Sequence, residues 1–332
     1  MNNRKELLRK LRIFGIDLGN YDTKSENTTF PSGYEGPFTS RPVMAAHCLE
    51  LDGKYYTPSI DRLYYMRDKT NDERCIVLTL ISIAREILQK FDKAENISKE
   101  EIQEYITHIT KIGLGAGLPV SHYKKAAIDN LIAYYKKYMQ DGIDFTYDDY
   151  HFHFSMEFCS IYPQGGAAAA CKANKIALQY NTYYVIDIGG YTIDVALFKN
   201  GCPEKDRISL EMGTITLYDN IVNKVFANCD INIDYDAIEA VLKNENTILS
   251  DEVKTIIREM TNNHANSILN ALRQQKIMFD SHPCLFVGGG SILLKDSILR
   301  NPMIKKDAVQ FISDTRANAK GYARLLKSEL SA

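Results

Sequence analysis

A six-residue pattern occurs twice in this chain and constrains its fold more than any other feature. The sequence I-D-L-G-N-Y at residues 16–21 returns as I-D-I-G-G-Y at residues 186–191, 170 positions later in a chain of 332. Each copy follows a short apolar run, which predicts a buried strand that ends at an aspartate. A carboxylate in such a place is costly unless it has a function. The repeat therefore predicts two related half-domains, each offering one acidic, glycine-rich turn to a shared cleft.

The overall composition excludes several classes of protein. A chain of 332 residues can bury two ordinary cores, and its 45% of apolar residues is usual for a soluble globular protein. The formal net charge of −2 gives no general attraction to nucleic acid or anionic lipid. Seven cysteines without a C-x-x-C pair indicate reduced thiols, not disulfides or a zinc site. With no signal-peptide pattern and no apolar run of membrane-spanning length, we expect a cytoplasmic protein.

Strand-like and helix-like segments are mixed along the chain, which favours an α/β fold. We expect strands at residues 12–18, 109–118, 152–161, 182–197 (a strand, a turn and a strand) and 284–287. Helical patterns cover residues 72–91, 99–108, 123–139, 167–179, 216–228, 235–243, 251–278 and 316–329. The second of these has a capping box, Ser98 with Glu101, at its start. Glycines in the 109–118 strand predict a close approach of another backbone.

The two acidic turns are suited to phosphate. Backbone N–H groups around a glycine at a strand end can surround an anion, because glycine allows close approach and positive φ. In the first turn we expect donors from Gly19, Asn20, Tyr21, Asp22 and Thr23, and a positive charge from Lys24. In the second we expect Gly189, Gly190, Tyr191 and Thr192. We expect Asp17 and Asp187 to hold Mg²⁺ through water beside a triphosphate, because Mg²⁺ keeps most of its water ligands.

A third glycine-rich turn follows the short apolar run at residues 284–287. It contains Gly288, Gly289, Gly290, Ser291 and Ile292. Three glycines between a strand and a helix could bind a base or a ribose, or could only make a tight connection. The sequence leaves both interpretations open.

In this order and spacing, D-L-G-N-Y-D-T-K, D-I-G-G-Y-T-I-D and V-G-G-G-S-I-L-L resemble the phosphate 1, phosphate 2 and adenosine motifs of the actin-like ATPase superfamily. The resemblance implies an α/β, actin-like two-lobed fold: duplicated ribonuclease-H-like domains with a nucleotide cleft between them. Residues 117–119, 162–164 and 317–322 are further similar to the ParM and actin-like-protein group of plasmid-segregating bacterial actins.

The resemblance also implies roles by position. Lys24 corresponds to a phosphate-contacting lysine, and Gly213 and Thr214 fall near the ribose. Gln164 corresponds to a residue that orients the attacking water. Together with Asp187 of the phosphate 2 motif, it is a candidate catalytic residue. The alternative for Gln164 is a turn residue after proline. Gly321 falls where the closing helix packs tightly on the hinge helix.

The same resemblance divides the chain. We expect domain I at residues 12–165 and 315–332, with a small inserted lobe at about 28–72. A hinge helix would cover residues 166–181, and domain II residues 182–314. His151 and His153 would share one strand face, but no third metal ligand is placed, so we expect a surface or packing role.

The function implied is a filament-forming ATPase, or GTPase, that hydrolyses its nucleotide with Mg²⁺ and segregates plasmid DNA by dynamic polymerisation. The expected partners are further copies of the chain and a DNA-binding adaptor on a plasmid centromere, with no direct contact to nucleic acid and none to a membrane. Two alternatives stay open. One is a membrane-associated, shape-determining filament that uses residues 1–12, and the other is a non-polymerising phosphotransferase.

Overall fold

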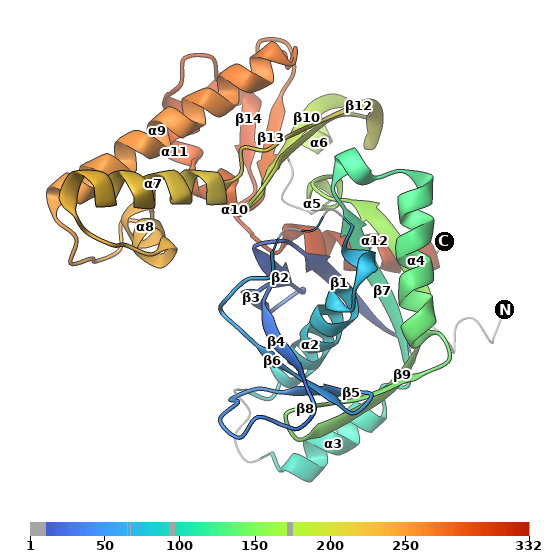
Figure 1. Cartoon of the computed structure of the whole chain (residues 1–332). Coiled ribbons are helices and arrows are strands. Elements are labelled where there is room, and N and C mark those ends of the chain that lie inside the picture. Colours follow the sequence, from blue (N-terminus) through green and yellow to red (C-terminus); the bar gives the residue numbers. More distant parts are fainter. Residues whose placement is uncertain (1–10, 65, 67, 93–96, 171–174, 332) are drawn as a thin grey trace. The chain divides into compact units, whose positions relative to one another are not determined.

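The computed structural model describes residues 11–64, 66, 68–92, 97–170 and 175–331 (Figure 1). The chain divides into two compact units, and each is described by itself. Unit 1 comprises the described part of Met1–Ala168 together with Arg316–Ala332, and unit 2 comprises that of Ala169–Thr315. Most of the predicted N-terminal segment at 1–12, and Cys171, lie outside the described residues.

Unit 1 is built on a nine-stranded sheet whose third strand, β1, carries the first acidic turn. Its strand order is β3-β2-β1-β7-β9-β8-β5-β6-β4. β1 pairs antiparallel with β2 and parallel with β7, and β7 pairs parallel with β9. The bounds are β1 Leu11–Leu18, β2 Asp22–Lys24, β3 Thr29–Pro31, β4 Tyr34–Phe38, β5 Leu49–Leu51, β6 Lys54–Pro58, β7 Lys111–Leu118, β8 Ile143–Tyr147 and β9 Tyr150–Pro163.

Unit 2 repeats the first five positions of that arrangement. Its sheet has the order β12-β11-β10-β13-β14. The central β10 pairs antiparallel with β11 and parallel with β13, which pairs parallel with β14. The bounds are β10 Thr182–Ile188, β11 Ile193–Lys199, β12 Cys202–Leu210, β13 Cys284–Val287 and β14 Val309–Phe311. Equal strand order and direction in the two units confirm the predicted duplication.

The helices follow the predicted patterns with shifted ends. The capping box of α3 is present, because Ser98 and Glu101 exchange side-chain and backbone hydrogen bonds. The described helices are α2 Arg74–Leu88, α3 Lys99–Thr107, α4 Lys125–Met139, α5 Gly166–Ala169, α6 Lys175–Gln179, α7 Thr214–Cys229, α8 Tyr235–Leu242, α9 Asp251–Gln274, α10 Gly289–Leu293, α11 Lys295–Arg300 and α12 Ala317–Ser331, with short 3₁₀ turns η1 Lys69–Asn71, η2 Val120–His122 and η3 Lys306–Ala308. No helix in these described parts is long and apolar enough to cross a membrane.

Two predicted helices are matched only in part by the helices of the structure. The pattern at 251–278 overruns α9, which ends at Gln274 because Lys276 takes a left-handed φ of 63°. Ile277 continues the apolar spacing but is buried by the turn that follows instead. The predicted helix at 167–179 appears as α5 and α6, and since residues 171–174 lie outside the described residues, its continuity stays a prediction.

The last helix, α12, packs on β1 and β7 through glycine. A Cβ on Gly15 of β1 would lie 1.9 Å from the Ala319 carbonyl oxygen, and one on Gly115 of β7 would lie 2.8 Å from that of Tyr322. A Cβ on Gly321 would lie 2.1 Å from the Ala167 carbonyl oxygen, at α5. These distances are too short for any side chain, which confirms the close packing predicted for the β7 glycines and for Gly321.

The two strand histidines lie on the surface, with a partner that the sequence did not reveal. His151 Nε2 and His153 Nδ1 lie 3.2 and 3.0 Å from one oxygen of Asp144, and all three side chains are exposed. Asp144 faces His153 across the β8–β9 pair. Among the residues described, no group of three or more histidine, cysteine or acidic side chains has an arrangement that could hold a metal ion.

Candidate functional site

The first acidic turn, turn 1 (residues 19–23), runs from β1 into β2 and includes Asp22 and Thr23, the first two residues of β2. Asp17 pairs directly with Lys24 across this hairpin. Directly opposed residues share one face of the sheet with Cβ atoms about 5 Å apart, so Lys24 stands beside Asp17. Asp17 is only 6% exposed. A buried carboxylate and a lysine are therefore held together next to the turn.

Two amide side chains fix the Asp17 carboxylate. Gln164, just after β9, donates from Nε2 to Asp17 Oδ1 at 2.9 Å, and Asn318 of α12 donates from Nδ2 to Oδ2 at 3.5 Å. Asn318 also accepts a hydrogen bond from the Gly165 N–H at 2.9 Å. Asn318 is buried and was missed as a site residue. It lies 301 positions from Asp17, and its one signal was its place in the 317–322 segment.

The backbone of turn 1 is held from the next strand pair. Ser32 donates its hydroxyl to the Gly19 carbonyl at 2.6 Å and its N–H to the Tyr21 carbonyl at 3.1 Å. A Cβ on Gly19 would lie 2.5 Å from the Asp22 carbonyl oxygen, so the tight bend requires glycine. With the carbonyl groups of Gly19 and Tyr21 tied back, the turn has a fixed shape.

The second acidic turn, turn 2 (residues 189–192), joins β10 to β11 in unit 2. Here Asp187 pairs across the hairpin with Asp194, the position that Lys24 occupies in unit 1. Thr192 donates its hydroxyl to Asp194 Oδ2 at 2.9 Å. The Gly189 N–H donates to the Thr192 carbonyl at 2.9 Å. The N–H of Gly189, expected as a phosphate donor, is therefore used within the turn, and this glycine can contribute only close approach.

The start of α7 holds turn 2 in place. Gly213, Thr214 and Ile215 donate their N–H groups to the carbonyls of Tyr191, Gly189 and Gly190 at 3.0, 3.1 and 2.8 Å. A Cβ on Gly213 would lie 2.2 Å from the Gly190 carbonyl oxygen. The structure thus brings Gly213 and Thr214 against turn 2, with their N–H groups used by the turn itself.

The third glycine turn, turn 3 (residues 288–291), lies against the same carboxylate. Gly288 has φ of 86°, and a Cβ there would lie 2.4 Å from Asp187 Oδ1. A Cβ on Gly290 would lie 2.7 Å from Thr214 Cγ2, whereas one on Gly289 would meet nothing within 4 Å. Ser291 is buried and donates to the Gly288 carbonyl at 2.8 Å. Gly288 and Gly290 are packing requirements, and Gly289 faces open space.

The predicted site residues thus form two groups, one in each unit. Unit 1 brings together Asp17, Gly19, Asn20, Tyr21, Asp22, Thr23, Lys24 and Gln164. Unit 2 brings together Asp187, Gly189, Gly190, Tyr191, Thr192, Gly213, Thr214, Gly288, Gly289, Gly290, Ser291 and Ile292, the last within α10. Asp17 lies beside Lys24 and accepts a hydrogen bond from Gln164, and Asp187 lies against Gly288 of turn 3.

A partly buried histidine supports the group in unit 2. His264 of α9 lies with Nε2 3.1 Å from the carbonyl oxygen of Met212, the residue before Gly213. Burial lowers the pKa of His264 below its usual 6.5. The ring is therefore neutral at pH 7, and its Nε2–H donates to that carbonyl.

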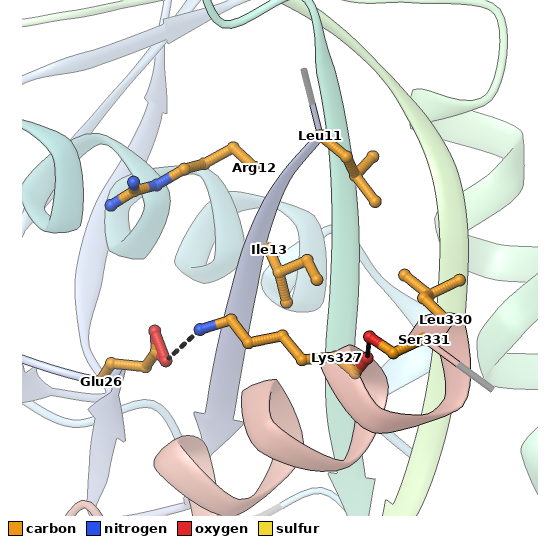
Figure 2. A pocket seen from close by; sticks show the side chains of 7 residues that line it. All are labelled: Leu11, Arg12, Ile13, Glu26, Lys327, Leu330 and Ser331. Carbon is orange, nitrogen blue, oxygen red and sulfur yellow. Dashed lines mark hydrogen bonds and ion pairs between the residues drawn. The ribbon is translucent and has the colours of Figure 1, made fainter. Parts of the chain in front are cut away.

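Unit 1 also has an open pocket of about 330 Å³ that lies apart from turn 1 (Figure 2). Lys327 Nζ lies 3.4 Å from Glu26 Oε1 on one side of it. Its lining residues are Leu11, Arg12, Ile13, Glu26, Lys327, Leu330 and Ser331. The pocket lies at the start of β1, and six residue steps along the strand, about 20 Å, separate Leu11 from Asp17. No predicted site residue lines it.

Several solved structures resemble the chain along nearly its whole length. A crystal structure of Ta0583, an archaeal actin homologue, has a TM-score of 0.73 at 18% identity, covering 96% of this chain and 100% of that one. The chain has an actin-like fold. The structure of a 15-stranded ParM filament from Clostridium botulinum has a TM-score of 0.67 at 18% identity, covering 96% of this chain and 99% of that one. ParM with ATP from Bacillus thuringiensis gives 0.64 at 13%, with 97% and 100% covered.

Sequence comparison matches a smaller part of the chain than structural comparison does. The profile of a family described as "Archaeal actin homologue MreB-like, C-terminal" matches residues 185–300. This stretch contains turn 2, the start of α7 and turn 3. No curated protein matches the sequence. The match thus covers the site residues of unit 2 and none of those of unit 1.

Proposed function

We propose that this chain is a filament-forming nucleoside triphosphatase that uses Mg²⁺ with ATP or GTP. The observation that carries the proposal is the doubled arrangement: in each unit, the third strand of the sheet has an aspartate as its next-to-last residue, just before a glycine turn. Solved structures with this fold are described as an archaeal actin homologue in complex with ADP, a ParM with ATP and a ParM filament. Their likeness supports nucleotide binding and assembly for this chain.

Phosphate binding is assigned to the two turns. In turn 1, the N–H groups of Asn20, Tyr21 and Asp22 would face phosphate oxygens, and Lys24 would add a charge. Thr23, expected as a donor, is fully buried between β1 and β3 and would only support the turn. In turn 2, Gly190, Tyr191 and Thr192 would do so, while turn 3 and Gly213–Thr214 would lie beside the sugar and base. This arrangement uses short backbone dipoles, which bind phosphate without needing many cations.

The two aspartates fit a hydrated Mg²⁺ better than a directly bound one. Both oxygens of Asp17 already accept an amide hydrogen bond, from Gln164 and from Asn318. A carboxylate has about four lone-pair sites, so each oxygen can still accept from a water molecule. When bound, Mg²⁺ would neutralise phosphate charge. Asp17 and Asp187 would orient its water ligands.

Gln164 would orient the water that attacks the terminal phosphate. Its Nε2 donates to Asp17, which leaves Oε1 as the atom that can accept a hydrogen bond from water. Because the contact to Asp17 fixes the amide, the direction of Oε1 is fixed as well. Catalysis would then consist of positioning and charge stabilisation, as in other phosphoryl transfers.

The cargo of the filament defines two candidate roles. The ParM likeness favours segregation of plasmid DNA, through a DNA-binding adaptor on a centromere. The MreB-like family match over residues 185–300 favours a cytoskeletal or shape-determining filament instead. Loss of the gene would cause plasmid loss with normal cell shape in the first case, and altered shape with stable plasmids in the second.

The direct test is assembly of the purified full chain. Light scattering and sedimentation would be followed with Mg-ATP, Mg-GTP, Mg-ADP and no nucleotide, with electron microscopy of the pellet and phosphate release in parallel. We expect filaments and phosphate release with at least one triphosphate, because head-to-tail contacts that do not close produce open polymers. A chain that stays monomeric at high concentration with every triphosphate would overturn the filament proposal.

A further inference from the structure

Turn 1 contains an acid that turn 2 lacks. When the two motifs are aligned on their aspartates, Asp22 of turn 1 falls opposite Thr192 of turn 2. A carboxylate within a phosphate-binding turn would repel the triphosphate, since like charges a few ångströms apart destabilise each other. Asp22 therefore needs a neutralising partner if turn 1 is to bind phosphate.

Arg62 is that partner, and it comes from the segment between β6 and η1. Its Nη2 lies 3.5 Å from Asp22 Oδ1. Its Nε donates to the Tyr21 carbonyl at 2.9 Å, and its guanidinium carbon lies 3.5 Å from the centre of the Tyr21 ring. The Arg62 and Asp22 side chains are 24% and 23% exposed. One cation thus contacts the charge, the backbone and the ring of two consecutive residues of turn 1.

The segment that carries Arg62 is fixed on both sides. Ser59 donates its N–H to the Gly33 carbonyl at 3.0 Å, and Leu63 donates to the Ser32 carbonyl at 2.9 Å. A Cβ on Gly33 would lie 2.0 Å from the Asp61 carbonyl oxygen, so the two backbones touch. Ser32 is the residue that also holds the Gly19 and Tyr21 carbonyls. The position of Arg62 is therefore set by the same residue that shapes turn 1.

We propose that Arg62 is a positioning residue for turn 1. It neutralises Asp22 and fixes the Tyr21 carbonyl, which keeps the N–H groups of the turn directed toward phosphate. Its effect on affinity should be larger for ATP than for ADP, because ATP carries more negative charge to be repelled by Asp22. This inference rests on the proposed nucleotide-binding function.

A double-mutant cycle tests the charge argument. Binding of Mg-ATP and Mg-ADP to the full chain would be measured for Arg62→Ala, Asp22→Asn and the double variant. We expect Arg62→Ala to weaken ATP binding about tenfold and ADP binding less. Asp22→Asn alone should bind ATP slightly more tightly, and the double variant should recover most of the loss, because the carboxylate that repels phosphate is gone.

The control is Arg41→Ala in the same unit. Arg41 pairs with Asp149 at 2.9 Å on the exposed surface, so its loss should leave nucleotide binding unchanged. If Arg62→Ala does not fold, by circular dichroism, Arg62→Lys decides the question: it keeps the charge, loses the Nε contact and should bind ATP about threefold more weakly. Wild-type affinity in that variant would overturn the proposal.

Outcomes separate this inference from the proposed function. If the wild-type chain binds neither ATP, GTP nor ADP, the proposed function fails, and the inference fails with it. If the wild type binds ATP and Arg62→Ala binds equally well, only the role of Arg62 is wrong. If Asp22→Asn fails to restore ATP binding in the double variant, Arg62 acts by structural support alone and the charge argument is wrong.

Discussion

In unit 1 the residue across the hairpin from the strand-end aspartate is Lys24, whereas in unit 2 it is Asp194. Over the five strand positions that the two sheets share, the strand order and the direction of each pair are the same in both units. The chemistry beside the two aspartates nevertheless has opposite charge. Duplication has preserved the backbone that presents a carboxylate and a glycine turn, while the neighbouring side chains have diverged.

The two turns also differ in the groups that hold them in place. Turn 1 is held by side chains: Ser32, Arg62 and the amides around Asp17. Turn 2 is held mainly by backbone, since the first N–H groups of α7 donate to it and Gly288 approaches Asp187 closely. Substitution of a side chain should therefore affect turn 1 more, and addition of a Cβ should affect turn 2 more.

The largest effect on activity is expected for the strand-end aspartates, the feature that the two units share. Asp17→Asn and Asp187→Asn should each lower Mg-dependent phosphate release by about 10²–10³-fold, because each removes a charge that orients water on Mg²⁺. Phosphate release would be measured over a range of Mg²⁺, with the exposed Asp144→Asn as the control. If only one aspartate matters, the two turns do not share the reaction.

The next effect is specific to turn 1. Gln164→Ala should slow turnover by about 10²-fold while filaments still assemble with triphosphate, because the amide orients water but does not bind nucleotide. Phosphate release and sedimentation would be measured on the same samples. Normal turnover would show that Gln164 is only a turn residue after Pro163.

A smaller effect should separate the two cross-strand partners. Lys24→Met should weaken ATP binding by about tenfold, because it removes a charge beside the phosphates. Asp194→Asn should leave ATP binding the same or tighter, since it removes a negative charge. Binding would be titrated with a fluorescent ATP analogue, with the exposed Lys125→Met on α4 as control. Equal losses in both variants would contradict the proposed asymmetry.

The backbone support of turn 2 can be tested by adding one carbon. Gly288→Ala should destabilise the fold by about 1–3 kcal/mol, because it forces alanine to positive φ against Asp187. Gly289→Ala should change stability by no more than about 0.5 kcal/mol, since its Cβ would meet open space. Urea unfolding of both variants makes the comparison, and equal stability would show that turn 3 yields to the added carbon.

The smallest effect concerns His264. Because its pKa is lowered in the folded chain, the unfolded chain binds the proton more readily, and stability is lost as pH falls below 6.5. Thermal unfolding between pH 7.5 and 5.5 should show a smaller loss for His264→Leu than for the wild type. Exposed His108→Gln should retain the wild-type slope. A steeper slope in His264→Leu would exclude this role.

Much of the fold follows from local patterns, and the candidate site follows from them in part. The repeat at 16–21 and 186–191 predicted two hairpins, and the seven-residue spacing from Asp17 to Lys24 proved to be a direct cross-strand pair. Asn318 and Arg62 could not be found in this way. They reach their partners across 301 and 41 positions, and contacts between distant segments leave no periodic pattern in the sequence.

The close contact of α12 with Gly15 has a consequence for the order of folding. Unit 2 is a continuous stretch, Ala169–Thr315, whereas unit 1 needs residues on both sides of it. Asn318, which donates a hydrogen bond to Asp17, is made after every other residue described here as holding the two aspartates. During synthesis unit 2 can fold as soon as it emerges, while β1 of unit 1 waits for α12. The carboxylate of Asp17 is thus made before unit 2 and brought into position by a helix made after it.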